Sequence, residues 1–311
     1  MSYHFLEVSS PNALLKVRDK QIYLNLNDLG ERRLPIEDTA AVIITSFNCS
    51  IHHSFFASSG RMNMPVLITC ENYKPQSVLL PAIRATDTSL LRSDWSYDEK
   101  LKSILWQKTI SAKIENQAEM LKVWGASPEE VAKVRGCSNM GPFHAREARA
   151  AKLYWSFWGK NLPKGFARKR RSGGLNSMLN YAYAVLVSVI TQRLLAAGLD
   201  PVRGFGHRFR ERTCALTYDI MEPFRIIADH AVWQLRDLVA TAVDSDGVIQ
   251  SPDCRKKLAG ILLSNESVGL FGKQGLQLIE NAIRSLRRAL LEKRAGIYQP
   301  WKFKYTKWAG Y

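Results

Sequence analysis

The chain has 311 residues and a formal net charge of +16, with 44 Lys and Arg against 28 Asp and Glu. Hydrophobic residues make up 46% and charged residues 23%, which are ordinary values for a folded protein. Intrinsic disorder over most of the chain and low-complexity classes are therefore excluded, since Gly (19) and Pro (12) are few. The length is too great for one small core and indicates two domains.

The sequence predicts no membrane-spanning helix, because no run of about 18 uninterrupted apolar residues occurs. The longest candidate, residues 181–197, is interrupted by Gln192 and Arg193. The first residues lack the basic-then-apolar layout of a signal peptide. The five cysteines are scattered and include no Cys-x-x-Cys pair. We therefore expect a cytoplasmic protein without a disulfide framework or a zinc site.

Short runs of branched and aromatic residues, broken by turn residues, predict β structure in the first third of the chain. The expected strands are residues 4–8, 13–17, 21–26, 41–45 and 65–69, with a short helix at 52–59. The continuous apolar runs at 41–44 and 65–69 predict strands that are buried on both faces. These elements indicate a small mixed-sheet domain over residues 1–85.

Helical periodicity begins near residue 88 and continues through most of the remaining chain. Ser127, Pro128 and the two following glutamates have the order typical of a helix start. The expected helices are residues 99–124, one beginning at 127, 142–158, 174–197, 217–241, 253–263 and 273–292. The predicted fold class is α+β, with the small N-terminal β-sheet domain followed by a larger all-α domain over residues 86–311, which ends in an aromatic and basic tail.

Three segments of the helical half carry side chains suited to metal binding. Glu147 lies beside small residues on an expected helix, and His207 lies on a loop that contains Gly and Pro. Asp219 and Glu222 are three residues apart and share a helical face, which Asp229 extends by two turns. Carboxylates with one imidazole suit Mg²⁺ or Mn²⁺. Taken singly, each has an ordinary structural explanation: a surface carboxylate, a loop histidine bonded to a carbonyl, or an acid paired with Arg or Lys.

The net charge favours a nucleic acid as the anionic partner, because basic surfaces neutralise phosphates and release counterions. Arg168, Arg170 and Arg171 lie in a basic loop before an expected helix, and Arg203 and Arg208 flank the loop histidine. Arginines clustered beside candidate ligands suit phosphate binding, although a solvated charged face is the alternative. No side-chain nucleophile motif occurs, so metal-assisted attack on a phosphodiester is the chemistry that these residues indicate.

Four stretches of the helical half, in this order, resemble the CRISPR spacer-acquisition integrases, the Cas1 family. They read E-A-R-A-A-K-L-Y-W (147–155), G-G-L-N-S-M-L-N-Y-A-Y-A-V-L (173–186), G-L-D-P-V-R-G-F-G-H (198–207) and L-T-Y-D-I-M-E-P-F-R-I-I-A-D (216–229). The stretches A-V-I-I-T (41–45) and M-P-V-L-I-T-C-E (64–71) look like the β domain of that family. The resemblance covers the chain to about residue 240 and is greatest to the type II branch.

The resemblance implies a catalytic role for four residues. Glu147, His207 and Glu222 match the family's three metal ligands, and Asp219 matches a further acidic position with a supporting role. Gly206 departs from the pattern, since a bulkier residue is expected before the histidine.

The activity that the resemblance implies is that of a metal-dependent DNA integrase and endonuclease, with Mg²⁺ or Mn²⁺ as cofactor. A 3′ hydroxyl of a short duplex attacks a phosphodiester of the repeat array and inserts the duplex as a spacer. The implied partners are double-stranded DNA, a second copy of the chain bound through the β domain, and a dimer of a small second adaptation protein between two such homodimers. The basic segment 168–171 corresponds to one that faces DNA.

Two alternatives remain open. A repair-type nuclease would use the same metal site with water as the attacking group. A non-catalytic DNA-binding protein would instead pair Asp219 and Glu222 with Arg or Lys and would bind no Mn²⁺.

Overall fold

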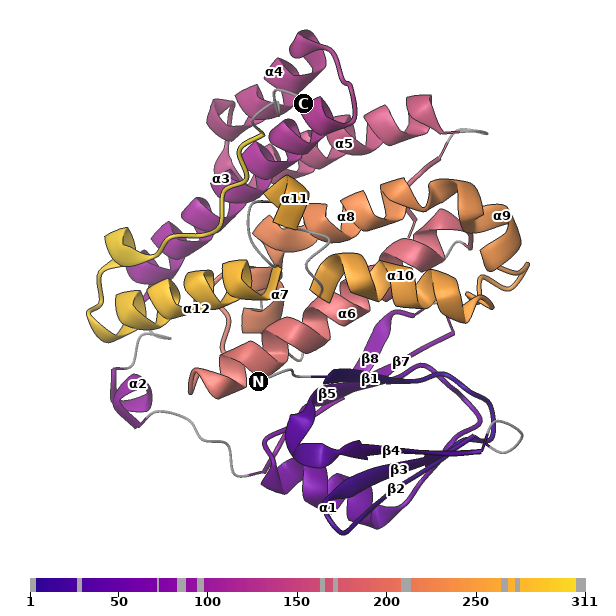
Figure 1. Cartoon of the computed structure of the whole chain (residues 1–311). Helices are drawn as coiled ribbons and strands as arrows, with labels where there is room; N and C mark the ends of the chain where they lie inside the picture. Colours follow the sequence, from indigo (N-terminus) through magenta and orange to yellow (C-terminus); the bar gives the residue numbers. More distant parts are fainter. Residues whose placement is uncertain are drawn as a thin grey trace.

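The computed structural model describes residues 4–26, 30–71, 73–82, 88–93, 98–162, 166–169, 173–207, 214–263, 268–271 and 275–305. A region of strands forms the lower part of the molecule in Figure 1, and a larger helical region lies above it. The α+β fold class, with the β-sheet region ahead of the helices, is therefore confirmed. The exact domain boundary at residue 85 stays a prediction.

The strands follow the predicted ranges closely, and three further strands are present. The β region consists of β1 (His4–Val8), β2 (Leu14–Arg18), β3 (Gln21–Asn25), β4 (Glu31–Pro35), β5 (Thr39–Ile44), β6 (Ser50–Ile51), α1 (His53–Arg61), β7 (Val66–Thr69) and β8 (Pro75–Leu79). Asp19 and Lys20 join β2 to β3 and both have positive φ, as a two-residue hairpin turn requires.

These strands form two four-stranded sheets. The expectation of a single mixed sheet was therefore wrong. One sheet has the order β1-β5-β7-β8, with β1, β5 and β7 parallel and β8 antiparallel. The other has the order β4-β3-β2-β6. The reason for a second sheet is physical, because strands as apolar as β5 and β7 need a protein layer on each face.

The central strands β5 and β7 of the first sheet are buried on both faces, as the apolar runs predicted. Val42 and Ile44 point into a small core with Phe55 of α1 and the second sheet. Ile43 and Leu67 point the other way and belong to the large core of the helical region. This alternation follows the two-residue period of a strand. One continuous core therefore joins the first sheet to the helices, which hold the candidate site.

The helical region follows the predicted ranges except over residues 217–241, and two short helices, at 88–92 and 268–271, were not predicted. It consists of α2 (Thr88–Arg92), α3 (Glu99–Val123), α4 (Pro128–Gly136), α5 (Phe143–Asn161), α6 (Leu175–Ala196), α7 (Ala215–Met221), α8 (Arg225–Gln234), α9 (Val239–Ala242), α10 (Pro252–Leu263), α11 (Val268–Phe271) and α12 (Gly275–Leu291). Ser127 caps α4 in a capping box with Glu130, which confirms the predicted helix start.

The continuous helix that we expected over residues 217–241 was wrong. α7 ends at Met221, a 3-10 turn covers Glu222–Phe224, and α8 begins at Arg225. Pro223 lies in that turn and explains the break, since proline lacks the N–H that an α-helix uses and its ring crowds the preceding turn. The break changes the directions of the acidic side chains on either side of it, so spacing alone does not place them on one stripe.

α6 runs through the middle of the molecule, between the first sheet and the other helices (Figure 1). Within the described residues it is the one helix with the length and hydropathy of a membrane span. Its most apolar window is 89% buried inside the protein. We therefore assign α6 as a core helix, because its apolar surface is already covered by protein.

Asp229 lies apart from the acids that precede it. Its carboxylate accepts hydrogen bonds from the hydroxyls of Tyr154, at 2.8 Å, and Tyr183. The side chain is buried in the helical core, and burial raises its pKa to about 6 despite the hydrogen bonds and the nearby Arg225. The expectation that Asp229 extends a metal-binding acidic stripe was wrong, because the side chain points into this tyrosine pair.

Asp229 should make the stability of the protein depend on pH. The folded state holds a proton on this carboxyl up to about pH 6, whereas the ordinary value is 3.8. The folded state therefore binds the extra proton between these values, and the free energy of unfolding falls as pH rises through that interval. Asp229→Asn should remove this component, which is on the order of 3 kcal/mol. Urea unfolding of both proteins from pH 4 to pH 7 checks this, and a pH-independent difference would contradict it.

The tail after α12 packs against the helical domain as far as Tyr305. The Asn116 amide on α3 donates to the carbonyl oxygens of Pro223, at 2.8 Å, and Trp301, at 3.0 Å. Its oxygen accepts the Phe303 N–H at 2.7 Å. The Trp301 ring stacks on Phe224, with ring centroids 5.3 Å apart. The tail thus ties α3 to the 3-10 turn that carries Glu222.

Candidate active site

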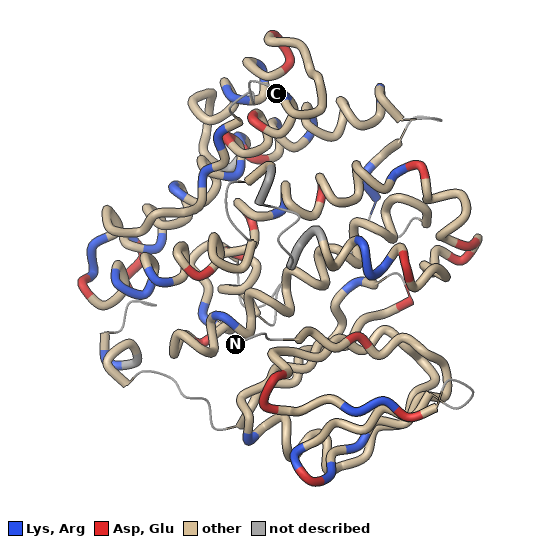
Figure 2. The backbone as a smooth tube through the Cα atoms, viewed as in Figure 1, with Lys and Arg blue, Asp and Glu red and all other residues tan. Residues whose placement is uncertain are grey.

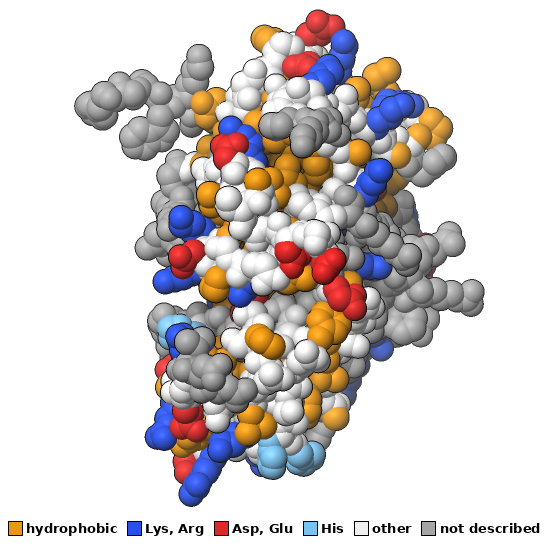
Figure 3. All heavy atoms as spheres, turned by 90° about the vertical axis from the view of Figure 1, so that its right-hand side faces the viewer, with side chains coloured by type: hydrophobic (Ala, Val, Ile, Leu, Met, Phe, Trp, Pro, Cys, Tyr) orange, Lys and Arg blue, Asp and Glu red, His pale blue; other side chains and the backbone are white. Residues whose placement is uncertain are grey.

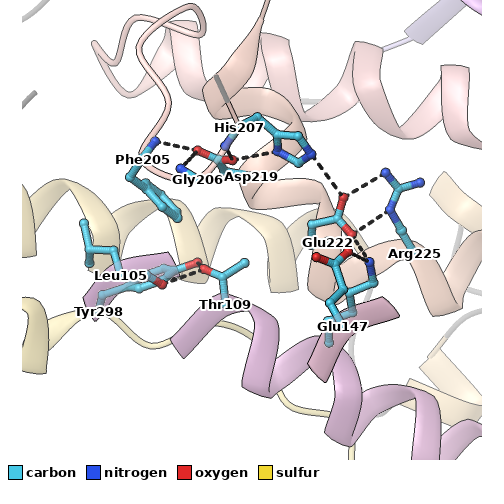
Figure 4. A network of polar contacts seen from close by, with 11 residues as sticks. Leu105, Thr109, Glu147, Phe205, Gly206, His207, Asp219, Glu222, Arg225 and Tyr298 are labelled. Atoms are coloured by element: carbon cyan, nitrogen blue, oxygen red, sulfur yellow. Dashed lines mark hydrogen bonds and ion pairs between the residues drawn. The ribbon is translucent and has the colours of Figure 1, made fainter. Parts of the chain in front are cut away.

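The candidate residues come from three distant segments that meet beside α3. Glu147 belongs to α5, His207 lies in the loop that follows α6, and Glu222 opens the 3-10 turn after α7. In Figure 4, Glu147 and Glu222 point toward one another, and the imidazole of His207 lies on the other side of Glu222. The structure therefore brings together the three side chains that the sequence singled out as metal ligands.

Lys113 of α3 lies between the two glutamates, and our reading of the sequence missed it. Its Nζ is 2.5 Å from Glu147 Oε1 and 2.5 Å from Glu222 Oε2. Burial opposes the charge of this ammonium, but attraction to Glu222 and Glu147 outweighs burial and raises its pKa. One signal was available, because Lys113 shares the buried stripe of α3 with Ile110 and Ile114, where an unpaired lysine is costly.

Glu222 is the most enclosed of the three candidate ligands, with 2% of its side chain exposed. Arg225 binds it through two hydrogen bonds, Nε to Oε2 at 2.9 Å and Nη2 to Oε1 at 2.8 Å. Burial works against its charge, yet Arg225 and Lys113 prevail and lower the pKa of Glu222 well below its ordinary value. The guanidinium of Arg225 also lies 4.8 Å from the centre of the Tyr183 ring. Glu222 is therefore an ionised carboxylate held in one orientation.

Asp219 faces the loop before it and not the glutamates. Its carboxylate accepts backbone N–H groups from Phe205 at 2.6 Å, Gly206 at 2.9 Å and His207 at 2.7 Å. The same carboxylate contacts His207 Nδ1 at 2.8 Å. This leaves His207 Nε2 toward Glu222, 3.9 Å from Oε1 (Figure 4). Asp219 and Glu222 thus have different tasks, because Asp219 orients the histidine.

The structure explains why residue 206 is glycine in this chain, although the family pattern led us to expect a bulkier residue. A Cβ at this position would lie 2.1 Å from the Trp106 ring, closer than any side chain can approach. Trp106 also packs edge-on against His207, with ring centroids 5.4 Å apart. The indole therefore fills the space of the missing side chain, and the loop backbone is fixed by Asp219.

The carboxylates of Glu147 and Glu222 and the imidazole of His207 are donor groups that suit a divalent cation. The Lys113 ammonium, however, lies between the two carboxylates. Two carboxylate oxygens converge on the Lys113 ammonium, and the Nε2 of His207 lies 3.9 Å from the other oxygen of Glu222, Oε1. Carboxylate oxygens and imidazole nitrogen are the ligands that Mg²⁺ and Mn²⁺ accept. Over the described ranges, no three Asp, Glu, His or Cys side chains stand in ligating geometry. The place between the two carboxylates is held by the Lys113 ammonium.

The candidate DNA-binding arginines have different outcomes. Arg168 donates to Asn176 at 2.8 Å and to Asn180 at 2.8 Å, so its guanidinium joins the basic loop to α6. Arg203 is exposed and lies 3.9 Å from Asp200. The remaining predicted contacts lie outside the described residues: Arg170, Arg171 and Arg208. Contact with DNA stays a prediction for all five arginines.

The described basic residues are spread over the molecule. Lys and Arg occur on helices of the helical region and on strands of the β region (Figure 2). On the face shown in Figure 3, the described Lys and Arg side chains lie apart from one another, among acidic and apolar ones. The net charge alone therefore does not locate a nucleic-acid surface.

The five cysteines form no disulfide bond with one another, and Cys137, Cys214 and Cys254 are buried.

The fold and the site together define an α+β protein whose helical domain holds a carboxylate and histidine centre. A family model described as CRISPR associated protein Cas1 matches residues 6–268. A CRISPR-associated endonuclease Cas1 from Saccharolobus solfataricus is 30% identical over 245 residues, covering 74% of this chain and 74% of the relative. One from Neisseria meningitidis is 28% identical over 226 residues, covering 71% and 72%. The chain belongs to the CRISPR-associated Cas1 family, as the resemblance predicted.

Solved structures agree on the fold. A Cas1 protein from Thermotoga maritima has a TM-score of 0.78 at 17% identity, covering 98% of this chain and 100% of that one. A casposase bound to its integration product has a TM-score of 0.70 at 19% identity, with 96% of each chain covered. A chain of a Cas6-RT-Cas1–Cas2 complex has a TM-score of 0.80 at 16% identity, covering 97% of this chain and 36% of that one.

Proposed function

We propose that this protein is the metal-dependent DNA integrase and endonuclease of CRISPR adaptation, which inserts short duplexes into a repeat array. The observation that carries the proposal is the convergence of Glu147 and Glu222 on one cation, the Lys113 ammonium, with His207 Nε2 lying 3.9 Å from the other carboxylate oxygen of Glu222. Family membership supports it, since the two curated relatives described above are named endonucleases. The array lies on cytoplasmic DNA, so we place the protein in the cytoplasm.

The proposed site residues divide the work between holding a cation and shaping its surroundings. Glu147, Glu222 and His207 would hold Mg²⁺ or Mn²⁺, which supplies polarisation of a phosphodiester and activation of the attacking oxygen. Asp219 holds the histidine with Nε2 turned to the site. Arg225 fixes the carboxylate of Glu222 through two hydrogen bonds and keeps it ionised. The 3′ hydroxyl of the incoming duplex would be the attacking group, since the sequence carries no recognised nucleophile motif.

The DNA backbone would approach from the side of Arg225. A pocket of about 100 Å³ next to Glu222 is lined by Lys74, Arg168, Arg225, Tyr183 and Tyr218, among others. Its cationic and aromatic lining suits a phosphodiester backbone. The basic loop that holds Arg168 borders this pocket, which supports the predicted role of residues 168–171 in binding DNA.

The proposed assembly follows the relatives. One structural neighbour is part of a Cas6-RT-Cas1–Cas2 complex, and another is bound to an integration product. We propose double-stranded DNA, a homodimer formed through the β domain, and a dimer of a small second adaptation protein as the partners of this chain. Size-exclusion chromatography with light scattering, with and without that protein, tests the stoichiometry, and a monomer under all conditions would contradict it.

A joining assay separates the proposed integrase from a plain nuclease. A labelled duplex with free 3′ hydroxyls is incubated with a repeat-containing plasmid and Mn²⁺, and joined product is resolved on a denaturing gel. We expect covalent joining with the wild type and none with His207→Ala. Cleavage without joining would favour the repair-type nuclease, in which water attacks.

One observation favours the non-catalytic alternative. Glu222 does pair with Arg225 and Lys113, which is the outcome expected for a carboxylate with only a structural task. Asp219 instead accepts three backbone N–H groups and contacts His207, a pattern that orients a ligand. Calorimetric titration with Mn²⁺ decides between the two, since a purely structural site would bind none.

A further inference from the structure

Lys113 is a permanent positive charge at the position that a metal ion needs. Its ammonium contacts both candidate carboxylate ligands at 2.5 Å, and 9% of its side chain is exposed. Two carboxylates side by side, one of them buried, repel each other unless a cation lies between them. The ammonium therefore does in the metal-free protein what a divalent ion would do after binding.

The charges of the site are balanced without a metal. Glu147 and Glu222 contribute two negative charges, and Lys113 and Arg225 contribute two positive ones. A divalent ion added to this balanced group would leave an excess of positive charge in a largely buried place, which is costly. The surplus is relieved when the ammonium leaves the carboxylates, and the flexible lysine stem permits that movement.

Arg225 is the less suitable group to leave. It holds Glu222 through two hydrogen bonds and lies over the Tyr183 ring. Within the described residues, the ion pairs of Lys113 are those with the two carboxylates. Glu147, one of those partners, has 36% of its side chain exposed, so the site is open to solvent on that side.

We propose that Lys113 is an internal competitor for the metal position, which keeps metal affinity low until the ammonium is displaced. The displaced ammonium would meet the phosphate of incoming DNA, so that DNA and metal favour each other's binding. This inference deepens the proposed function and rests on it, since it takes Glu147 and Glu222 as the metal ligands.

Calorimetric titration of the full chain with Mn²⁺ tests the competition. Lys113→Gln keeps a hydrogen-bond donor and removes the charge, so Mn²⁺ should bind about ten-fold more tightly or better, which corresponds to about 1.4 kcal/mol. Its melting temperature without metal should fall, and Mn²⁺ should raise it by more than in the wild type. Lys122→Gln is the matched control, because Lys122 lies on the same helix and pairs with Glu119 away from the site. Equal or weaker Mn²⁺ binding by Lys113→Gln would overturn the proposal.

A second experiment uses the wild-type protein, so its result does not depend on whether a variant folds. Reductive methylation with formaldehyde, mapped by mass spectrometry, reports how accessible each lysine is. Saturating Mn²⁺ should increase labelling of Lys113 several-fold and leave Lys122 unchanged, and unchanged labelling of Lys113 would overturn the proposal. The two proposals can fail separately. If the wild type joins no DNA but Lys113→Gln still binds Mn²⁺ more tightly, the proposed function is contradicted, whereas the competition between Lys113 and the metal is supported.

Discussion

Glu147→Gln is expected to abolish strand joining while leaving the stability of the protein close to that of the wild type. The carboxylate is 36% exposed, and the amide that replaces it still accepts a hydrogen bond from Lys113. Glu147 is partly exposed and the buried Lys113 keeps Glu222 as a partner, so the loss of this ion pair should cost about 1 kcal/mol. Loss of one charged metal ligand should lower the joining rate by at least about a thousand-fold, since a metal contributes several kcal/mol to the transition state.

Glu222→Gln provides the contrast to this variant. It should lose joining to the same extent, but its free energy of unfolding should fall by about 3–5 kcal/mol, because Arg225 and Lys113 would lose a buried charged partner. Joining rates and urea unfolding of both variants check the pair of expectations. Substantial joining by Glu147→Gln would show that the cation position formed by the glutamates is not catalytic.

Asp219→Asn is expected to weaken Mn²⁺ binding by about 10–100-fold, although Asp219 does not point at the metal position. The carboxylate accepts three backbone N–H groups and contacts the Nδ1 of His207. The amide group of asparagine places a donor against those donors, so the loop and the imidazole should lose their fixed orientation. Calorimetry with Mn²⁺ measures the effect on affinity, and thermal melting measures the effect on the fold.

Asp200→Asn is a suitable control for this loop. Asp200 accepts the Val202 N–H at 3.1 Å and lies in the same loop, but it has no contact with His207 in the described structure. The control should bind Mn²⁺ as the wild type does. If Asp219→Asn also kept wild-type Mn²⁺ affinity while melting at a lower temperature, Asp219 would only stabilise the loop and would not orient a ligand.

Much of the fold could be predicted from local patterns, and the failures have local causes too. The strand at residues 4–8 and the capped start of α4 were confirmed, because alternation and capping depend on residues a few positions apart. The helix expected over 217–241 failed at Pro223, where the missing N–H and the ring were not given enough weight. The second sheet was missed because its two edge strands, β4 and β6, are short and mostly exposed, with little apolar alternation.

The amino-acid sequence alone determined the family, the order of the elements and the three residues that we propose as metal ligands. Only the tertiary structure decided that Lys113 lies between two of them and that Asp219 faces the histidine loop instead of joining Glu222. The reason is that helix and strand formation are governed by near neighbours, whereas the partner of a buried charge depends on which distant helix crosses it. α3 crosses α5 and the turn after α7 at this point. The spacing of residues within any one of these segments does not reveal that they cross.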